Sequence, residues 1–117
     1  MSDFETYTQK YIKFRNDRDW QQYHKPKDLA LSLVLEAAEL LELFQWKTDK
    51  QVEEMITDPV ATEKLADELA DVLGWILILA HDCKIDLGVA LENKLAKNGK
   101  KYPIEKSKGS SKKYTEL

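Results

Sequence analysis

The segment of residues 26–46 constrains the fold most, because the strong helix formers Leu, Ala and Glu occupy most of its positions. Pro26 suits the first turn of the helix that this composition predicts. Its apolar residues lie nearly all round that helix and include Leu29, Leu33, Leu40, Leu41 and Phe44. A helix of this kind has to be buried on several sides, in a bundle or between copies of the chain.

The rest of the chain also has helical patterns and no convincing strand. Further helices are expected over residues 3–17, 51–57, 61–82 and 87–97. Asp86 is expected to cap the start of the last of them. Asn98-Gly99 is a stop signal for that last helix. Four Gly and three Pro among 117 residues argue against a turn-rich β fold. We therefore expect an all-α bundle of four to five helices, with one domain over residues 1–105 and a loosely held basic tail over 106–117.

Charge is distributed unevenly along the chain. Residues 94–113 hold eight of the 18 Lys and Arg residues but one of the 21 Asp and Glu residues. The acidic remainder would repel a polyanion, so no nucleic acid polymer is expected as a partner. The lysines near residue 100 either form a solvated basic end or meet phosphate groups.

The sequence has no feature of a membrane or secreted protein. Its longest apolar run, Val72–Ala80, is far shorter than the roughly 20 residues that span a bilayer, so no membrane partner is expected. The first five residues lack an apolar signal core. A single cysteine, Cys83, fits a reducing compartment and is interpreted as a core residue. A cytoplasmic location is expected.

Two of the expected helices carry pairs of acids among apolar residues. Glu36 and Glu39 are three residues apart, as are Glu68 and Asp71, so each pair shares one helix face. Asp67 lies one position off that face. Two such pairs on facing helices would make a cluster of four carboxylates, for which a hard divalent cation is the natural compensation. The alternative is that these acids are surface residues paired with lysines.

Other metal and nucleotide motifs do not match. The only histidines are His24 and His81, and neither forms the Glu-x-x-His pair of a ferritin-like di-iron site. No Cys and His spacing suits zinc. The glycines, at positions 74, 88, 99 and 109, allow neither a Walker A loop nor a dinucleotide-binding fingerprint.

The acid pairs also resemble the signature of a known family. Glu36-Ala-Ala-Glu39 followed by Glu68-Leu-Ala-Asp71 is similar to the Glu-x-x-Glu and Glu-x-x-Asp motifs of the MazG-like all-α nucleotide pyrophosphohydrolases. Other blocks in the same order resemble the dCTP pyrophosphatase branch: Arg18-Asp-Trp20, His24-Lys-Pro-Lys-Asp-Leu29, Glu42-Leu-Phe-Gln-Trp46 and the segment Lys94 to Pro103. The resemblance covers roughly residues 4–106 and extends to the end of the chain.

The resemblance implies Mg²⁺-dependent hydrolysis of a nucleoside triphosphate to the monophosphate and pyrophosphate. The favoured substrate is dCTP or a modified dCTP, and the role is the cleaning of the nucleotide pool. Relatives form homotetramers built as dimers of dimers. The implied metal ligands are Glu36, Glu39, Glu68 and Asp71, which would hold Mg²⁺, with Mn²⁺ as a possible substitute. The implied catalytic residues are Glu36 and Glu39, and Glu39 would polarise the attacking water.

The same resemblance implies two sets of substrate contacts. The phosphate side would use Lys94, Asn98, Lys101 and Tyr102, although the family often has Arg where this chain has Lys101, and Lys lacks the bidentate fork. Base and sugar contacts would come from Trp20, His24 and Trp46, for which core or interface packing is the alternative.

Several interpretations stay open at this level. Trp75 is expected to pack in the core, and Gly74 is expected to allow a close helix approach, because Gly within a helix costs about 1 kcal/mol relative to Ala. The same chemistry could act on another substrate, such as dUTP or phosphoribosyl-ATP. A non-catalytic helical interaction module is a third possibility, against which the complete set of four acids argues.

Overall fold

The computed structural model describes residues 3–117, and every regular element in this range is a helix, which confirms the all-α class. The chain divides into two compact units, one ending at Lys84 and one beginning at Ile85. The elements of the first unit are α1 (Asp3–Asp17), the 3₁₀ turn η1 (Gln21–Tyr23), α2 (Pro26–Glu42), α3 (Asp49–Met55) and α4 (Pro59–Asp82). Those of the second unit are α5 (Leu87–Lys101), α6 (Ile104–Ser107) and the 3₁₀ turn η2 (Tyr114–Glu116).

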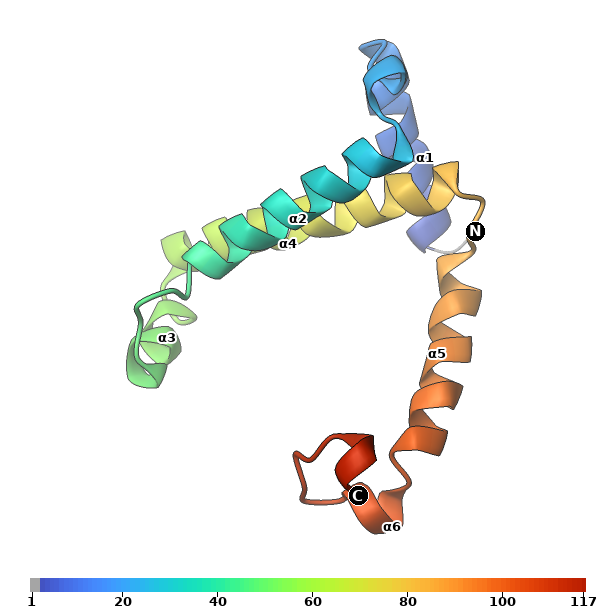
Figure 1. Cartoon of the computed structure of the whole chain (residues 1–117). Coiled ribbons are helices and arrows are strands. Elements are labelled where there is room, and N and C mark those ends of the chain that lie inside the picture. The colour runs from blue at the N-terminus through green and yellow to red at the C-terminus, as the bar shows by residue number, and fades with distance from the viewer. Residues whose placement is uncertain (1–2) are drawn as a thin grey trace. The chain divides into compact units, whose positions relative to one another are not determined.

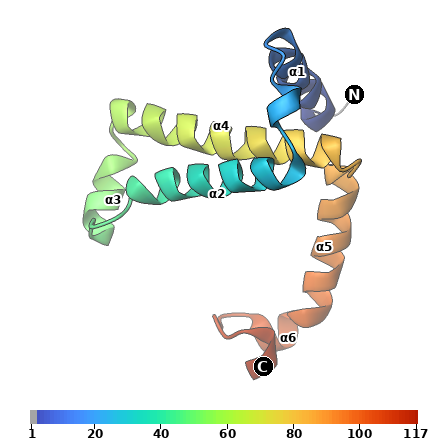
Figure 2. The ribbon, with the colours of Figure 1, turned by 45° about the horizontal axis from the view of Figure 1, so that its top comes forward.

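The first unit is built on α2 and α4, which lie antiparallel and side by side (Figure 1; Figure 2). Helix α1 packs against α4. A small core forms from Ile12 of α1, Leu29 of α2 and Ile78 of α4, so it sits where the three helices meet. Tyr11 and Trp75 pack against the core from its edge. This core fixes the ends of α2 and α4 that neighbour α1.

Side-chain caps define where the helices begin. Asp58 accepts a hydrogen bond from the backbone N–H of Val60 and precedes Pro59 at the first position of α4. Thr48 and Gln51 form a reciprocal capping box at the start of α3. Asp86 caps α5 as the sequence predicts, by accepting from the N–H of Val89. These caps satisfy backbone donors that the first turn of a helix leaves free.

Helix α2 is shorter than the sequence predicts. It ends at Glu42 rather than near Trp46, and the chain leaves it through turns in which the N–H of Phe44 donates to the carbonyl of Leu41 at 2.9 Å. Trp46 then adopts a left-handed backbone conformation with φ of 67°. The reversal brings the chain to Thr48, where α3 begins. A prediction from side-chain composition misses the end of α2 at Glu42, because Phe44 and Trp46 continue the apolar pattern of the helix.

Helix α5 is longer than the sequence predicts. Asn98 and Gly99 do not stop it, and the helix continues to Lys101. No atom outside its own helix lies within 4 Å of a Cβ placed on Gly99, so a side chain would fit at this position. The helix ends at Tyr102 because Pro103 follows, and a residue before proline is disfavoured in the α conformation.

The second unit has ordered contacts within the segment predicted to be a loose tail. The rings of Tyr102 and Tyr114 meet edge to face with centroids 5.9 Å apart. The Nζ of Lys101 lies 4.8 Å from the centroid of Tyr114. These contacts connect η2 to the end of α5. The domain boundary after residue 105 stays a prediction.

Two further findings concern exposure. Cys83 is exposed rather than part of the core, because it is the C-terminal cap of α4 and follows the last residue of the helix. The interpretation of Cys83 as a core residue is therefore wrong.

Among residues 3–117, no helix combines the length and the apolar character needed to cross a bilayer.

Candidate functional site

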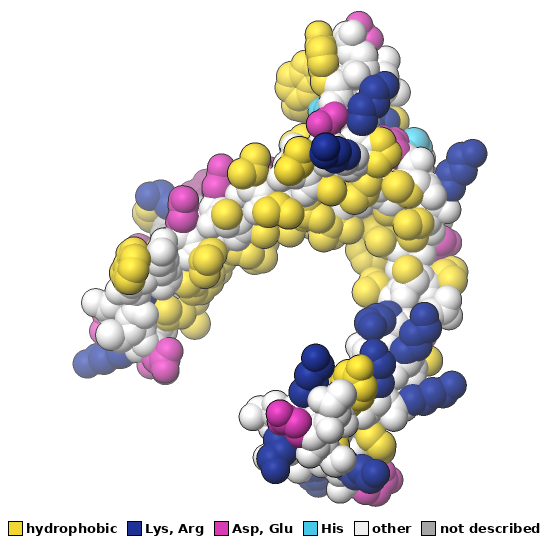
Figure 3. Space-filling model, viewed as in Figure 1, with side chains coloured by type: hydrophobic (Ala, Val, Ile, Leu, Met, Phe, Trp, Pro, Cys, Tyr) yellow, Lys and Arg dark blue, Asp and Glu magenta, His cyan; other side chains and the backbone are white. Residues whose placement is uncertain are grey.

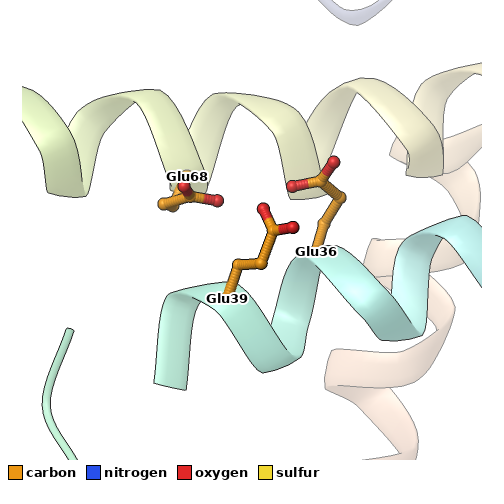
Figure 4. Close-up of side chains that lie close together, drawn as sticks. All are labelled: Glu36, Glu39 and Glu68. Atoms are coloured by element: carbon orange, nitrogen blue, oxygen red, sulfur yellow. The ribbon is translucent and has the colours of Figure 1, made fainter. Parts of the chain in front are cut away.

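Three of the predicted acids meet between α2 and α4. One carboxylate oxygen from each of Glu36, Glu39 and Glu68 lies within 4.8 Å of the other two. Their carboxylate ends point into the space between the two helices (Figure 4). The three-residue spacing places Glu36 and Glu39 on the same side of α2, and the antiparallel pairing brings Glu68 opposite them. The cluster predicted from spacing thus forms for these three acids.

Two oxygens of this cluster are buried without a hydrogen-bond partner. They are Oε2 of Glu36 and Oε2 of Glu68. Burial raises the pKa of Glu36, and the neighbouring Glu39 and Asp71 raise it further, while the Trp75 indole opposes them. Burial, followed by the charges of Glu39 and Asp71, likewise raises the pKa of Glu68. A pKa raised in this way marks carboxylates that lack a compensating positive charge.

Asp71 lies beside this group rather than within it. It is not one of the acids whose oxygens approach within 4.8 Å. Its charge nevertheless raises the pKa of both Glu36 and Glu68, and it lines the same cavity as Glu36. Asp67 is exposed and is not part of the acid cluster, as its position on the helix predicts. The structure therefore brings the four predicted acids to one region, with Asp71 at its edge.

The residues present fit a hard divalent cation. The donors are carboxylate oxygens, which Mg²⁺ and Mn²⁺ prefer. The unpartnered oxygens of Glu36 and Glu68 are buried acceptors that a cation would satisfy. No nitrogen or sulfur ligand belongs to the group, so the donor set does not favour zinc.

A cavity of about 500 Å³ adjoins the acids within the first unit. Its lining includes two acids, Glu36 and Asp71, and three aromatic side chains, Trp20, His24 and Trp75. His24 meets Trp75 edge to face, with ring centroids 5.4 Å apart, and Trp20 lies 6.5 Å from His24. Acidic and aromatic side chains therefore line the same cavity.

His24 occupies an unusual electrostatic position in this cavity. Its Nδ1 atom is buried and has no hydrogen-bond partner. Burial lowers the pKa of His24, and the positive charge of Arg15 lowers it further, against the opposing effect of Asp82 and Asp28. The lowered pKa favours the neutral imidazole, which offers a ligand one donor and one acceptor.

Several predicted substrate residues lie elsewhere. Trp46 is 92% exposed and does not line the cavity. Lys94, Asn98 and Lys101 belong to α5 in the second unit, where positions i, i+4 and i+7 place them on one helix face. Tyr102 is the cap that ends this helix. Their contact with phosphate stays a prediction.

The cavity also contains residues that the sequence did not single out for this role. Trp75 was expected to pack in the core, and it packs against the core cluster while also lining the cavity. Its place in the same helical row as Asp71 was the available signal. Arg15 and Tyr11 line the cavity from α1. No sequence pattern indicated them, because their position depends on how α1 packs against α4.

Comparison with known proteins shows relatives over most of the chain. The chain is 43% identical over 107 residues to dCTP pyrophosphatase 1 of Homo sapiens and 42% identical to that of Rattus norvegicus. Each match includes 92% of this chain, which spans 63% of the length of these relatives. The crystal structure of a pyrophosphatase from Archaeoglobus fulgidus superimposes with a TM-score of 0.81 at 36% identity, over 88% of this chain and 94% of that one.

The family model described as MazG-like matches residues 31–117, a range that includes all four predicted acids. The same four acids carry the resemblance in the sequence, and three of them meet between α2 and α4. The chain belongs to the MazG-like family.

Proposed function

We propose that this protein hydrolyses a nucleoside triphosphate, with dCTP or a modified dCTP as the favoured substrate, to the monophosphate and pyrophosphate. The observation that carries the proposal is that Glu36 of the acid cluster and Asp71 line the same cavity as Trp20, His24 and Trp75. The relatives named dCTP pyrophosphatase 1 support the choice of substrate. We infer that the activity serves to clean the nucleotide pool in the cytoplasm.

The acid part of the cavity is the proposed phosphate end. Glu36, Glu39, Glu68 and Asp71 would hold Mg²⁺, with Mn²⁺ as a substitute. When bound, such a cation neutralises phosphate oxygens and lowers the pKa of a coordinated water. A cation binds the ionised carboxylates, and the buried, unpartnered oxygens of Glu36 and Glu68 are the acceptors available for that purpose.

Glu39 is the proposed residue that polarises the attacking water. It is the exposed member of the cluster, whereas Glu36 and Glu68 are half-buried. As an exposed carboxylate of the cluster, Glu39 can accept a proton from water and release it to solvent. The oxygen of the water bonds to the α-phosphorus, the bond from that phosphorus to the bridging oxygen breaks, and pyrophosphate leaves.

The aromatic part of the cavity is the proposed base end. Trp20 and His24 would contact the base and sugar, as the resemblance implies, and Trp75 adds a third aromatic side chain. Stacking of a base on an aromatic side chain contributes roughly 1–3 kcal/mol. We propose that Lys94, Asn98, Lys101 and Tyr102 of the second unit bind the phosphates.

We further propose that the working form is a homotetramer, a dimer of dimers. The buried core of one chain is small, and hydrophobic side chains gather along the pair α2 and α4 (Figure 3). The exposed apolar residues at helical spacing on α2 and α4 are Leu31, Val34, Leu35, Leu41, Leu69 and Leu73. An apolar surface of this extent on two neighbouring helices is typical of an interface.

Light scattering tests the assembly. The chain of 13.6 kDa should scatter as a particle of four copies, and Leu35→Glu should reduce its size. Val60→Glu is the matched control, because Val60 is also exposed on α4 but faces away from Leu69 and Leu73. Active protein of 13.6 kDa at micromolar concentration would contradict the tetramer.

A pyrophosphate-release assay over the common NTPs and dNTPs, with Mg²⁺ and with a chelator, tests the activity. We expect Mg²⁺-dependent release that is fastest with dCTP or a modified dCTP. Reaction in ¹⁸O-labelled water should place the label in the monophosphate, because the water attacks the α-phosphorus. Preference for dUTP or phosphoribosyl-ATP would support the proposed reaction but contradict the proposed substrate. A folded protein that releases no pyrophosphate from any substrate would favour an interaction module.

A further inference from the structure

An ion pair between a buried arginine and a half-buried aspartate crosses from α1 to α4 beside the cavity. Arg15 is 7% exposed and is the one charged residue that is buried among residues 3–117. Its Nη1 atom donates to Oδ2 of Asp82 at 2.7 Å, and its Nη2 atom donates to Oδ1 at 3.0 Å. Arg15 lies in the last turn of α1, and Asp82 is the last residue of α4. Two parallel hydrogen bonds of this kind fix the orientation of both partners.

Arg15 also holds the loop that follows α1. Its backbone carbonyl accepts hydrogen bonds from the N–H of Trp20 at 3.1 Å and from the N–H of Arg18 at 3.2 Å. The guanidinium of Arg18 lies 3.5 Å from the centroid of the Phe14 ring. One residue therefore connects Asp82 through its side chain with Trp20 through its main chain.

The aromatic side chains form a row between the same two helices. The ring of Phe14 on α1 lies 5.9 Å from that of Trp20, Trp20 lies 6.5 Å from His24, and His24 lies 5.4 Å from Trp75 on α4. The row begins on α1, passes through the loop and ends on α4. The pair of Arg15 and Asp82 joins α1 and α4 by a second route, so it limits how far the row can open.

Stability alone does not explain a buried ion pair here. Removing charges from water costs as much as the pair commonly recovers, and well-packed apolar residues of similar volume are often as stable. The Nε atom of Arg15 is in addition buried without a hydrogen-bond partner. What the pair supplies that apolar side chains lack is a fixed direction, through its two hydrogen bonds.

We propose that Arg15 and Asp82 are positioning residues for nucleobase recognition: their ion pair fixes Trp20 and His24 at the base end of the cavity. This inference rests on the proposed function of that cavity. The pair does not belong to the acid cluster, and both Nη atoms of Arg15 are engaged by the carboxylate of Asp82. Its loss therefore weakens binding of the base and discrimination between bases, and leaves binding of the phosphates unchanged.

The double variant Arg15→Met/Asp82→Leu tests this role, because it removes both charges and leaves neither partner buried alone. We expect a melting temperature no lower than that of the wild type. KM for the best dNTP should rise about tenfold, within the range that a disturbed aromatic stack on a base would give. The rise should exceed any loss in kcat. The selectivity between the best dNTP and the other dNTPs should fall.

Inorganic tripolyphosphate separates positioning from general loosening, because it carries the phosphates without a base. Its inhibition constant against the best dNTP should be the same in the double variant and the wild type. Arg15→Lys keeps the charge without the bidentate geometry, so its KM should lie between those of the wild type and the double variant. The matched control is Lys13→Met/Asp17→Leu, which removes an exposed ion pair of 2.6 Å from the same helix, and it should leave KM unchanged.

The outcomes distinguish this inference from the proposed function. A wild type that hydrolyses dNTPs, together with a folded double variant of unchanged KM and selectivity, would overturn the positioning role alone. An equal weakening of dNTP and tripolyphosphate would also overturn it, because the effect would then be structural. A wild type that neither binds nor hydrolyses any nucleoside triphosphate would overturn both proposals.

Discussion

A Cβ atom on Gly74 would lie 2.8 Å from Cε1 of Tyr11, which is closer than side chains approach in folded proteins. The phenol ring of Tyr11 therefore rests directly on the backbone of α4, and the glycine within this helix is explained by the close approach of α1. The close packing expected at Gly74 is confirmed. The contact also forms part of the cavity wall, since both residues line it.

Gly74→Ala should lower the melting temperature. The overpacking costs roughly 1–3 kcal/mol, and the higher helix propensity of Ala returns about 1 kcal/mol of it. In a Tyr11→Leu background the shorter side chain leaves space, so the same substitution should be neutral or stabilising. Thermal unfolding of the four proteins in a double-mutant cycle measures this coupling. An equal cost of Gly74→Ala in both backgrounds would place the strain elsewhere.

Asp71→Asn should abolish catalysis without harming the fold. The substitution removes one of the negative charges that raise the pKa of Glu36 and Glu68, so the metal-free protein should be as stable as the wild type or slightly more so. Metal affinity and kcat should both collapse. Isothermal titration with Mg²⁺ and single-turnover kinetics provide the two measurements.

Asp67→Asn is the matched control for that experiment. Asp67 is an exposed acid on the same helix, outside the cluster, and its loss should leave turnover and metal affinity largely unchanged. Turnover at the wild-type level in Asp71→Asn would contradict the assignment of the metal face. Loss of turnover in a folded Asp67→Asn protein would contradict it equally.

The raised pKa values of Glu36 and Glu68 predict how stability depends on pH. The folded, metal-free protein holds protons on these groups that the unfolded chain releases near pH 4.5. The free energy of unfolding should therefore fall as the pH rises from about 4.5 through the raised pKa values. Mg²⁺ binds the deprotonated carboxylates, so it should reverse this loss, by about 2.7 kcal/mol at a hundredfold excess over Kd.

Melting curves between pH 4 and pH 8, in a chelator and in Mg²⁺, measure the effect. Glu36→Gln should flatten the pH dependence in the chelator and remove most of the stabilisation by Mg²⁺. A melting temperature of the metal-free wild type that rises over the range where these carboxylates ionise would show that their burial is compensated within the chain.

Trp46→Gly should raise KM for the best dNTP more than it lowers kcat, without lowering the melting temperature. Trp46 is exposed and holds a left-handed conformation, which costs roughly 1–2 kcal/mol for a residue other than glycine. Glycine relieves this cost and removes the ring to which the family resemblance assigns a base contact, although this ring does not line the cavity of the first unit. Trp46→Phe keeps an aromatic ring and should retain most of the affinity. An unchanged KM for all substrates in Trp46→Gly would exclude Trp46 from the base site.

The sequence by itself determined the helices and the pairing of acids along them. Helical periodicity and caps such as Asp86 are local properties, so they predict where α1, α4 and the start of α5 lie. The spacing of Glu36 and Glu39 places both on one face of α2 for the same reason. Local patterns failed where a turn decided the outcome, as at Trp46, whose apolar side chain continues the pattern of a helix that has already ended.

Only the tertiary structure decided which side chains meet. Glu68 lies opposite Glu36 because α2 and α4 pair antiparallel, and no feature of either helix alone gives that register. Arg15 and Asp82 pair across 67 positions of sequence, and Trp75 reaches the cavity from the helix that also forms the core. Contacts of this kind arise from the packing of whole helices, whose energy depends on surfaces brought together from distant parts of the chain. A periodic pattern records that a face is apolar or acidic, but it does not record which partner covers that face.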